Sequence, residues 1–282
     1  MAGNTPNKVK YGLKNVHYAP ITVAEDGTVT FGTPVRIPGA VNLTMDAQGE
    51  TSTFYADDMA YFVAAGNDGY SGTLEIALVP DSFRVDILKE KLDETSQVLV
   101  ENVDAQSNPF ALLFEFNGDQ KAIRHVLYNC VCGRTGVSGS TTTNTKDPIT
   151  ETMNLTASPL ANGNTKARTT ANTPLADYNA WYTHVWQPLS QLTVTSAAGT
   201  SPGDTILTVT PPLGDGHSYK TKTGATVALP AYGATIGSDW QDWDGSAEVA
   251  ATTGQQIAVI EVDANQKAVA GGIAEVTANG GV

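Results

Sequence analysis

The chain has 282 residues, 41% of them hydrophobic and 16% charged, and is long enough to bury the cores of one large domain and a smaller second one. Its 29 acidic residues outnumber its 16 basic ones, so the formal net charge is −13. Tight binding of nucleic acid needs a basic patch, and the absence of a Lys/Arg cluster argues against that class of function.

The low charged fraction and the many Thr, Ser, Asn and Gly residues favour β-sheets joined by turns over long helices. The first residues lack the apolar stretch of a signal peptide, and no apolar run is long enough to cross a membrane. We therefore expect a soluble protein, made in the cytoplasm, that has no membrane partner.

In the first half, residues 16–38 predict a β-hairpin that turns at an Glu-Asp-Gly sequence. Residues 40–69 carry acidic side chains between aromatic ones, and we expect a long hairpin or an extended loop that projects from the body. Residues 71–80 alternate cleanly, which predicts a strand with Leu74, Ile76 and Leu78 on one face.

The next segments predict a helix over 81–94, introduced by a Pro-Asp-Ser sequence, and a strand pair over 108–133 that turns at Asn-Gly-Asp. The composition of residues 134–150 is typical of a flexible loop, and residues 149–160 predict an amphipathic strand. A short helix is expected within 171–188, with Tyr178, Trp181, Tyr182 and Val185 at helical spacing and Pro188 ending it.

The composition changes after Pro188. Residues 189–282 hold only three cations against nine acids, and short strands alternate with turn signals about every ten residues. This pattern favours a small β-sandwich or meander. We expect one domain over residues 1–188 and a second, all-β domain over residues 189–282.

No catalytic or metal-binding motif is present. Cys130 and Cys132 point to the same face of a strand, a poor geometry for a disulfide, and we expect two reduced packing cysteines. The acidic residues Asp57, Asp58 and Asp68 lack the alternation of a Ca²⁺ loop. Four histidines lie in four separate segments without ligand spacing: His17, His125, His184 and His217. We therefore predict that the chain is not an enzyme and needs no cofactor or metal.

Trp240 and Trp243 lie close together beside three aspartates. Two such rings could form a platform that stacks on sugar faces, which would make the C-terminal domain a carbohydrate-binding or adhesion module. A small β-domain also needs large residues to close its core, and this second interpretation is the favoured one.

Four long segments carry a resemblance to a known family: YGLKNV (11–16), the run from FYADD to NDGYSGTLEIALVP (54–80), LLFEFNGD to RHVLYNC (112–130) and TETMNLTASP (150–159). Over about residues 5–188 the chain resembles the major tail, or tail tube, proteins of long-tailed, non-contractile (siphovirus-type) bacteriophages. The C-terminal region resembles the small Ig-like domains that some tail proteins add to their outer surface.

The resemblance implies a mainly β fold, a β-sandwich or barrel with a flanking helix, whose subunits close into hexameric rings. Stacked rings would form the tube that conducts double-stranded DNA during ejection without binding it tightly. The implied partners are further copies of the chain, the tape measure protein, the tail terminator and the distal tail protein. The expected location is the virion tail, after synthesis and assembly in the host cytoplasm.

Strand phase and the resemblance together give candidate residues. Those expected to face the lumen are Thr73, Glu75, Glu115, Thr152 and Asn154. The loops around 46–60 and 134–148 are candidates for contacts between rings, and the first of them offers anchors and charges at Phe54, Tyr55, Asp57, Asp58, Met59, Tyr61 and Phe62.

Overall fold

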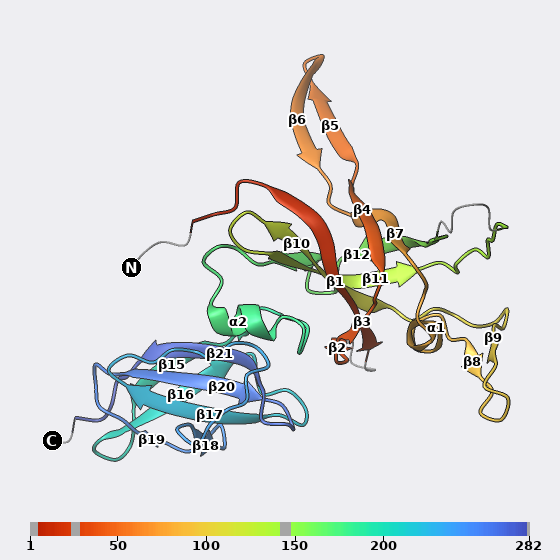
Figure 1. Cartoon of the computed structure of the whole chain (residues 1–282). Coiled ribbons are helices and arrows are strands. Elements are labelled where there is room, and N and C mark those ends of the chain that lie inside the picture. The colour runs from red at the N-terminus through yellow and green to blue at the C-terminus, as the bar shows by residue number, and fades with distance from the viewer. Residues whose placement is uncertain (1–4, 24–28, 142–147, 281–282) are drawn as a thin grey trace. The chain divides into compact units, whose positions relative to one another are not determined.

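The computed structural model describes residues 5–23, 29–141 and 148–280, and it divides into two compact units, Met1–Val185 and Trp186–Val282. The described residues form strands and two short helices, so the predicted mainly β fold class is confirmed (Figure 1). No described helix is long and apolar enough to cross a membrane.

A nine-stranded antiparallel sheet dominates the first unit, with the order β2-β1-β10-β11-β12-β7-β4, while β13 pairs with β11 and β3 with β1. Two separate two-stranded ribbons, β5-β6 and β8-β9, complete the unit. The strands are β1 (Lys10–Val23), β2 (Val29–Phe31), β3 (Val35–Arg36), β4 (Ala40–Gln48), β5 (Thr51–Ala56), β6 (Met59–Ala65), β7 (Gly69–Ile76), β8 (Lys91–Leu92), β9 (Leu99–Val100), β10 (Phe110–Gly118), β11 (Ile123–Cys132), β12 (Glu151–Ser158) and β13 (Lys166–Arg168).

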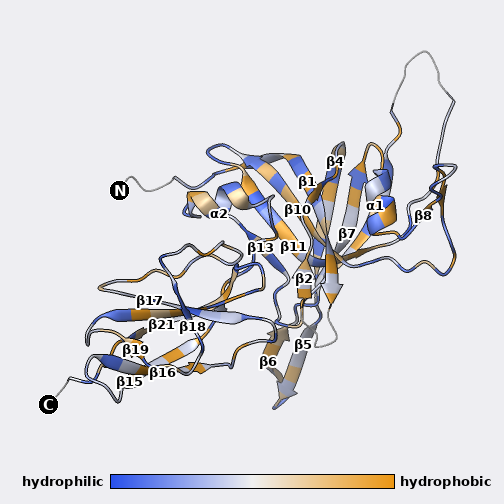
Figure 2. Ribbon diagram, turned by 90° about the horizontal axis from the view of Figure 1, so that it is seen from below, coloured by the Kyte–Doolittle hydropathy of each residue, from blue (hydrophilic) through white to orange (hydrophobic). Residues whose placement is uncertain are grey.

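The core of this unit lies on one face of the sheet. Alternate residues of β7, β10 and β12 point into it, and the period of two is visible as bands of hydropathy along the strands (Figure 2). Helix α1 (Asp81–Asp86) packs its buried Phe83 edge-on against Phe110, with ring centroids 5.4 Å apart. Both cysteines are free and buried in this core, and burial raises the pKa of the Cys132 thiol to about 12.

Both helices are shorter than the sequence pattern suggested. Helix α1 ends at Asp86 because Lys89 takes a left-handed φ of 62° and the chain enters β8, and no side chain caps its start. Helix α2 (Leu175–Ala180) stops before Trp181, although Trp181 and Val185 are buried as the spacing predicted. Leu78 was predicted to lie on the same strand face as Leu74 and Ile76, but it is 68% exposed because β7 already ends at Ile76.

Residues 40–76 form one long hairpin in two stages. Strands β4 and β7 pair within the sheet, and β5 and β6 then continue beyond its edge as a ribbon (Figure 1). Asp57 and Asp58, with φ values of 52° and 58°, make the turn at the tip. The prediction of a projecting hairpin over 40–69 is thus confirmed. The turn of the 16–38 hairpin lies outside the described residues, although β1 and β2 pair on either side of it.

The second unit is a two-layer β structure. One sheet has the order β14-β21-β20-β17-β18 and the other β15-β16-β19, and a core that includes Leu192, Leu207, Tyr219, Ile257 and Val259 fills the space between them. The strands are β14 (Ser190–Gln191), β15 (Thr193–Ala198), β16 (Asp204–Thr210), β17 (Ser218–Gly224), β18 (Gln241–Trp243), β19 (Val249–Ala250), β20 (Gln256–Val262) and β21 (Ala268–Glu275).

Gly72 tests how closely β4 and β7 must approach. A Cβ at Gly72 would lie 1.8 Å from the main-chain oxygen of Thr44 on β4, whereas a Cβ at Gly133 would meet nothing within 4 Å. We expect Gly72→Ala to lower the free energy of unfolding by about 1–3 kcal/mol in urea denaturation, because the strands must separate. Gly133→Ala should change it by less than about 0.5 kcal/mol, and equal effects would contradict this packing.

Candidate assembly surfaces

A polar surface covers the side of β4, β7 and β12 that faces away from the core. The register places Thr152, Glu75 and Asn42 in one row, and the rows beside it repeat the pattern. Each of the three strands contributes three polar side chains to this polar face: Asn42, Thr44 and Asp46; Ser71, Thr73 and Glu75; Thr152, Asn154 and Thr156. The structure therefore brings four of the five predicted lumen residues together.

The charge of the polar face has a single sign. Its two ionisable residues, Asp46 and Glu75, are both carboxylates, and neither forms an ion pair with any described cation. Thr150 donates a hydrogen bond to Glu75 Oε1 at 2.5 Å. Such a surface repels polyanions and cannot hold phosphate groups through counterion release.

Glu115, the fifth predicted lumen residue, is not exposed. Glu115 points to the side of the sheet that its position in the strand predicted. Only 6% of the residue is accessible, because the segment following α2 covers this end of the sheet. β1 bulges between Lys14 and His17, which lets Asn15 Nδ2 donate to Glu115 Oε1 at 2.8 Å. Arg124 Nε lies 3.1 Å from Glu115 Oε2, and the Tyr182 hydroxyl donates to the same oxygen at 3.2 Å. Glu115 is therefore a structural residue, and the lumen assignment is corrected.

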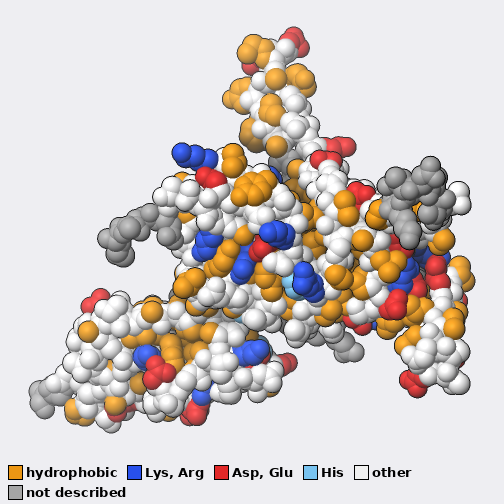
Figure 3. Space-filling view, in the orientation of Figure 1, with side chains coloured by type: hydrophobic (Ala, Val, Ile, Leu, Met, Phe, Trp, Pro, Cys, Tyr) orange, Lys and Arg blue, Asp and Glu red, His pale blue; other side chains and the backbone are white. Residues whose placement is uncertain are grey.

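The tip of the projecting ribbon is as exposed as the sequence suggested. Tyr61 is 75% accessible, and hydrophobic side chains gather along the ribbon in Figure 3. Large apolar patches on a folded surface mark sites of interaction. We call residues 54–62 the hairpin tip; the predicted anchors and charges all lie in it: Phe54, Tyr55, Asp57, Asp58, Met59, Tyr61 and Phe62. The second predicted contact loop, 134–148, lies partly outside the described residues.

Trp240 and Trp243 do not form a surface platform. They are 9% and 8% accessible, Trp243 packs against Tyr219 and donates to the Ala247 carbonyl oxygen at 2.8 Å, and Trp240 belongs to an apolar cluster with Ile260. The favoured interpretation, that these rings close the core of a small domain, agrees with their burial. The sugar-contact assignment is corrected, because rings with so little accessible surface cannot form a platform for a sugar.

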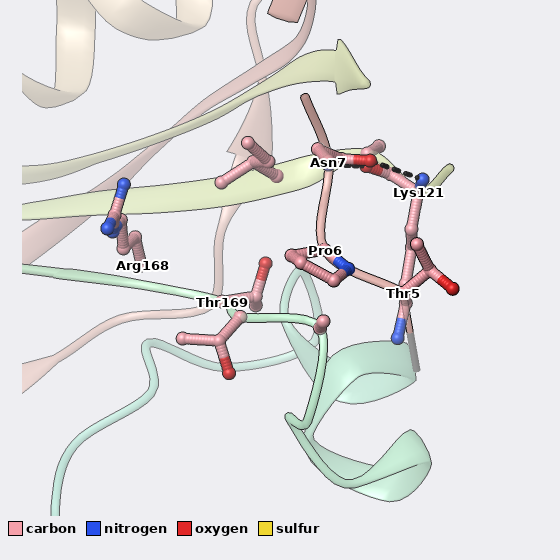
Figure 4. A pocket seen from close by; sticks show the side chains of 10 residues that line it. Thr5, Pro6, Asn7, Lys121, Arg168 and Thr169 are labelled. Carbon is pink, nitrogen blue, oxygen red and sulfur yellow. Dashed lines mark hydrogen bonds between the residues drawn. The ribbon is translucent and has the colours of Figure 1, made fainter. Parts of the chain in front are cut away.

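A hollow of about 190 Å³ lies beside the N-terminal segment, and Asn7, which lines it, forms hydrogen bonds within the protein (Figure 4). Asn7 Nδ2 donates to the Lys121 carbonyl oxygen, and Asn7 Oδ1 accepts from the main-chain N–H groups of Gln120 and Lys121. These bonds fasten the start of the chain to the β10-β11 turn. Among the described residues, no group of three or more His, Cys, Asp or Glu side chains could hold a metal ion.

Strand pairing brought in residues that sequence reasoning had not assigned to the polar face, Asn42, Thr44, Asp46, Ser71 and Thr156. Their signal in the sequence was alternation alone, and β4 alternates too loosely to show which strand it pairs with.

Residues 4–109 match the phage tail tube protein family. Residues 4–109 are therefore a phage tail tube protein domain. The match confirms the predicted resemblance over these residues, the structural role in a phage tail and the prediction that the chain is not an enzyme. A place in the virion tail follows from a tail tube domain.

The second unit and the fold have further likenesses. Residues 197–279 match the C-terminal domain of the S-layer protein SbsC. Among solved structures, the tube-terminating cap of the anti-feeding prophage is 11% identical, with a TM-score of 0.32 over 57% of this chain and 93% of that chain. Domains 7, 8 and 9 of SbsC are 13% identical, with a TM-score of 0.30 over 97% of this chain and 72% of theirs. A search of curated proteins gave no match.

The ion pair between Glu115 and Arg124 can be compared with an exposed ion pair in the same unit, between Glu101 and Arg134. Glu115→Gln leaves the Arg124 guanidinium, 17% accessible, without its carboxylate, and we expect a loss of about 3 kcal/mol of unfolding free energy. Glu101 and Arg134 are both about half exposed, so Glu101→Gln should cost less than about 1 kcal/mol. Chemical denaturation measures both, and a loss at Glu115 no larger than that at Glu101 would contradict its structural role.

Proposed function

We propose that this chain is the subunit of a phage tail tube, in which copies close into hexameric rings and the rings stack into the conduit for genome ejection. The observation that carries the proposal is the polar face. It supplies a continuous hydrophilic wall whose reverse side is the buried core, as a tube lining requires. The residues proposed to face the lumen are Thr73, Glu75, Thr152 and Asn154, together with Asn42, Thr44 and Asp46.

Ring closure is supported by the edge of the sheet. β4 is the last strand in the hydrogen-bonded order of the nine-stranded sheet, and no described strand pairs with its outer main-chain groups. Exposed edges invite pairing with another chain, and closure into a ring removes them. The polar face would then continue from one subunit to the next around the bore.

DNA passage is supported by the charge of the same face. With Asp46 and Glu75 as its only ionisable residues, the wall repels phosphate, so double-stranded DNA would slide without being held. We further propose that the hairpin tip makes the contact between rings. Its apolar side chains would leave water when the next ring docks.

The remaining assignments follow the tube role. We propose that residues 1–188 form the tube domain and residues 189–282 a domain on the outer surface of the tail. Assembly would take place in the host cytoplasm, in a siphovirus-type tail whose tape measure, terminator and distal tail proteins set the length and ends of the tube.

Negative-stain electron microscopy of the full chain and of a variant ending at residue 188 tests the tube role. We expect both to form rings or hollow tubes, because the polar face and the hairpin tip lie within the retained residues. The tubes of the shorter chain should be thinner, since it lacks the outer domain.

If the full chain forms tubes and the chain ending at residue 188 does not, the C-terminal unit is part of the tube wall. Monomers from both chains at high concentration, even with the distal tail complex added as an initiator, would contradict the tube role.

A further inference from the structure

A cavity of about 330 Å³ opens at one end of the core of the first unit. Its walls come from six strands that are far apart in sequence, and its apolar surface includes the rings of Tyr70, Phe114 and Phe116. We call it the Lys10–Lys166 cavity, because these two lysines line it from β1 and β13. A space of this size and lining can accept an aromatic side chain.

The lysines of the cavity lack acidic partners. Lys10 Nζ lies 4.7 Å from the centroid of Phe116, and Lys166 Nζ lies 4.3 Å from that of Tyr70. No described carboxylate forms an ion pair with either lysine, and none of the lining residues is acidic. In a chain of net charge −13, this is a local cationic site with unused capacity for carboxylates.

His125 adds an unmet hydrogen-bonding group to the same cavity. Its ring stacks on Phe114 at 5.1 Å, and its Nε2 is buried with no hydrogen-bond partner among the described residues. Burial, reinforced by the charges of Lys10, Arg168 and Lys166, lowers the pKa of His125 to about 4. The ring is therefore neutral at pH 7, and the positive charge of the site comes from the lysines.

The hairpin tip has the complementary chemistry. It carries Asp57 and Asp58 at its turn, neither in an ion pair with a described residue, beside exposed rings such as Tyr61. It cannot reach its own cavity. Met45 and Tyr70 line the cavity near the base of the ribbon, and the ten residues from Gln48 to Asp57 extend the strand roughly 30 Å further.

We propose that the hairpin tip of a second copy of this chain docks in the Lys10–Lys166 cavity, with Asp57 and Asp58 against the two lysines and an aromatic ring against Phe114 and Phe116. The inference rests on the proposed tube function, for which it names the acceptor of the hairpin. A contact between two different surfaces of identical chains is open-ended, so it can propagate from ring to ring.

Zero-length carbodiimide crosslinking of the full-length protein, prepared as an equal mixture of ¹⁴N- and ¹⁵N-labelled chains, tests the contact directly. We expect mixed-isotope peptides that join Asp57 or Asp58 to Lys10 or Lys166. Tip peptides that crosslink to other lysines instead, or not at all, would overturn the proposal.

Charge reversal separates the contact from general charge effects. Lys10→Glu with Lys166→Glu should raise the protein concentration needed for tube assembly roughly tenfold, because like charges then meet. Asp57→Lys with Asp58→Lys should weaken tube assembly to the same degree, and the fourfold variant, with all four charges exchanged, should regain tubes. Lys89→Glu with Lys91→Glu, an equal change at two exposed lysines outside the cavity, should leave assembly unchanged.

The outcomes distinguish this contact from the tube role. Tubes without the predicted crosslinks, or tubes that withstand reversal of both cavity lysines, contradict the docking site and leave the tube role standing. Crosslinks between chains that never form rings or tubes support the docking site and contradict the tube role.

Discussion

The antiparallel register of β7 with β4 and β12 decides what each side of the sheet can do. Thr73 pairs with Asn154 and Thr44, and Leu74 pairs with Met153 and Leu43. Polar and apolar rows therefore alternate across the three strands. A slip of one residue in either pairing would turn apolar side chains to water and polar ones into the core. The buried core and the acidic polar face are therefore two consequences of one register.

The side of the sheet opposite the core is exposed in some strands and covered in others. At β4, β7 and β12 the side opposite the core is open and polar, whereas at β10 and β11 it is covered by the segment around α2. Trp181 Nε1 donates to the His125 carbonyl oxygen, and Glu115 is fully engaged beneath Tyr182. The proposed lumen wall of three strands thus adjoins a region of the same sheet that is buried on both sides.

Period-two patterns in the sequence predicted the strands well where they were strict. Thr152, Asn154 and Thr156 are exposed and Met153 and Leu155 buried, as their alternation indicated. The alternation of polar and apolar residues predicts which side of a sheet a side chain faces, but it does not predict which segment covers that side. The burial of Glu115 could therefore not be predicted.

The length of the helices and the burial of the tryptophans also depend on tertiary structure. The spacing over 81–94 suits a longer helix, but the left-handed turn at Lys89 ends it in favour of the β8-β9 ribbon. Whether Trp240 and Trp243 are a platform or a core depends on the strands that surround them, which the local sequence does not contain. The Lys10–Lys166 cavity likewise draws on six strands and has no signal in any one segment.

A cryo-electron microscopy reconstruction of the assembled tube tests the central claim most directly, because it shows which side of the sheet faces the bore. The account predicts that Thr73, Glu75, Thr152 and Asn154 line a continuous hydrophilic lumen, with β4 of each subunit meeting the next subunit around the ring. A tube in which these side chains face outward, or in which another sheet lines the bore, would contradict it.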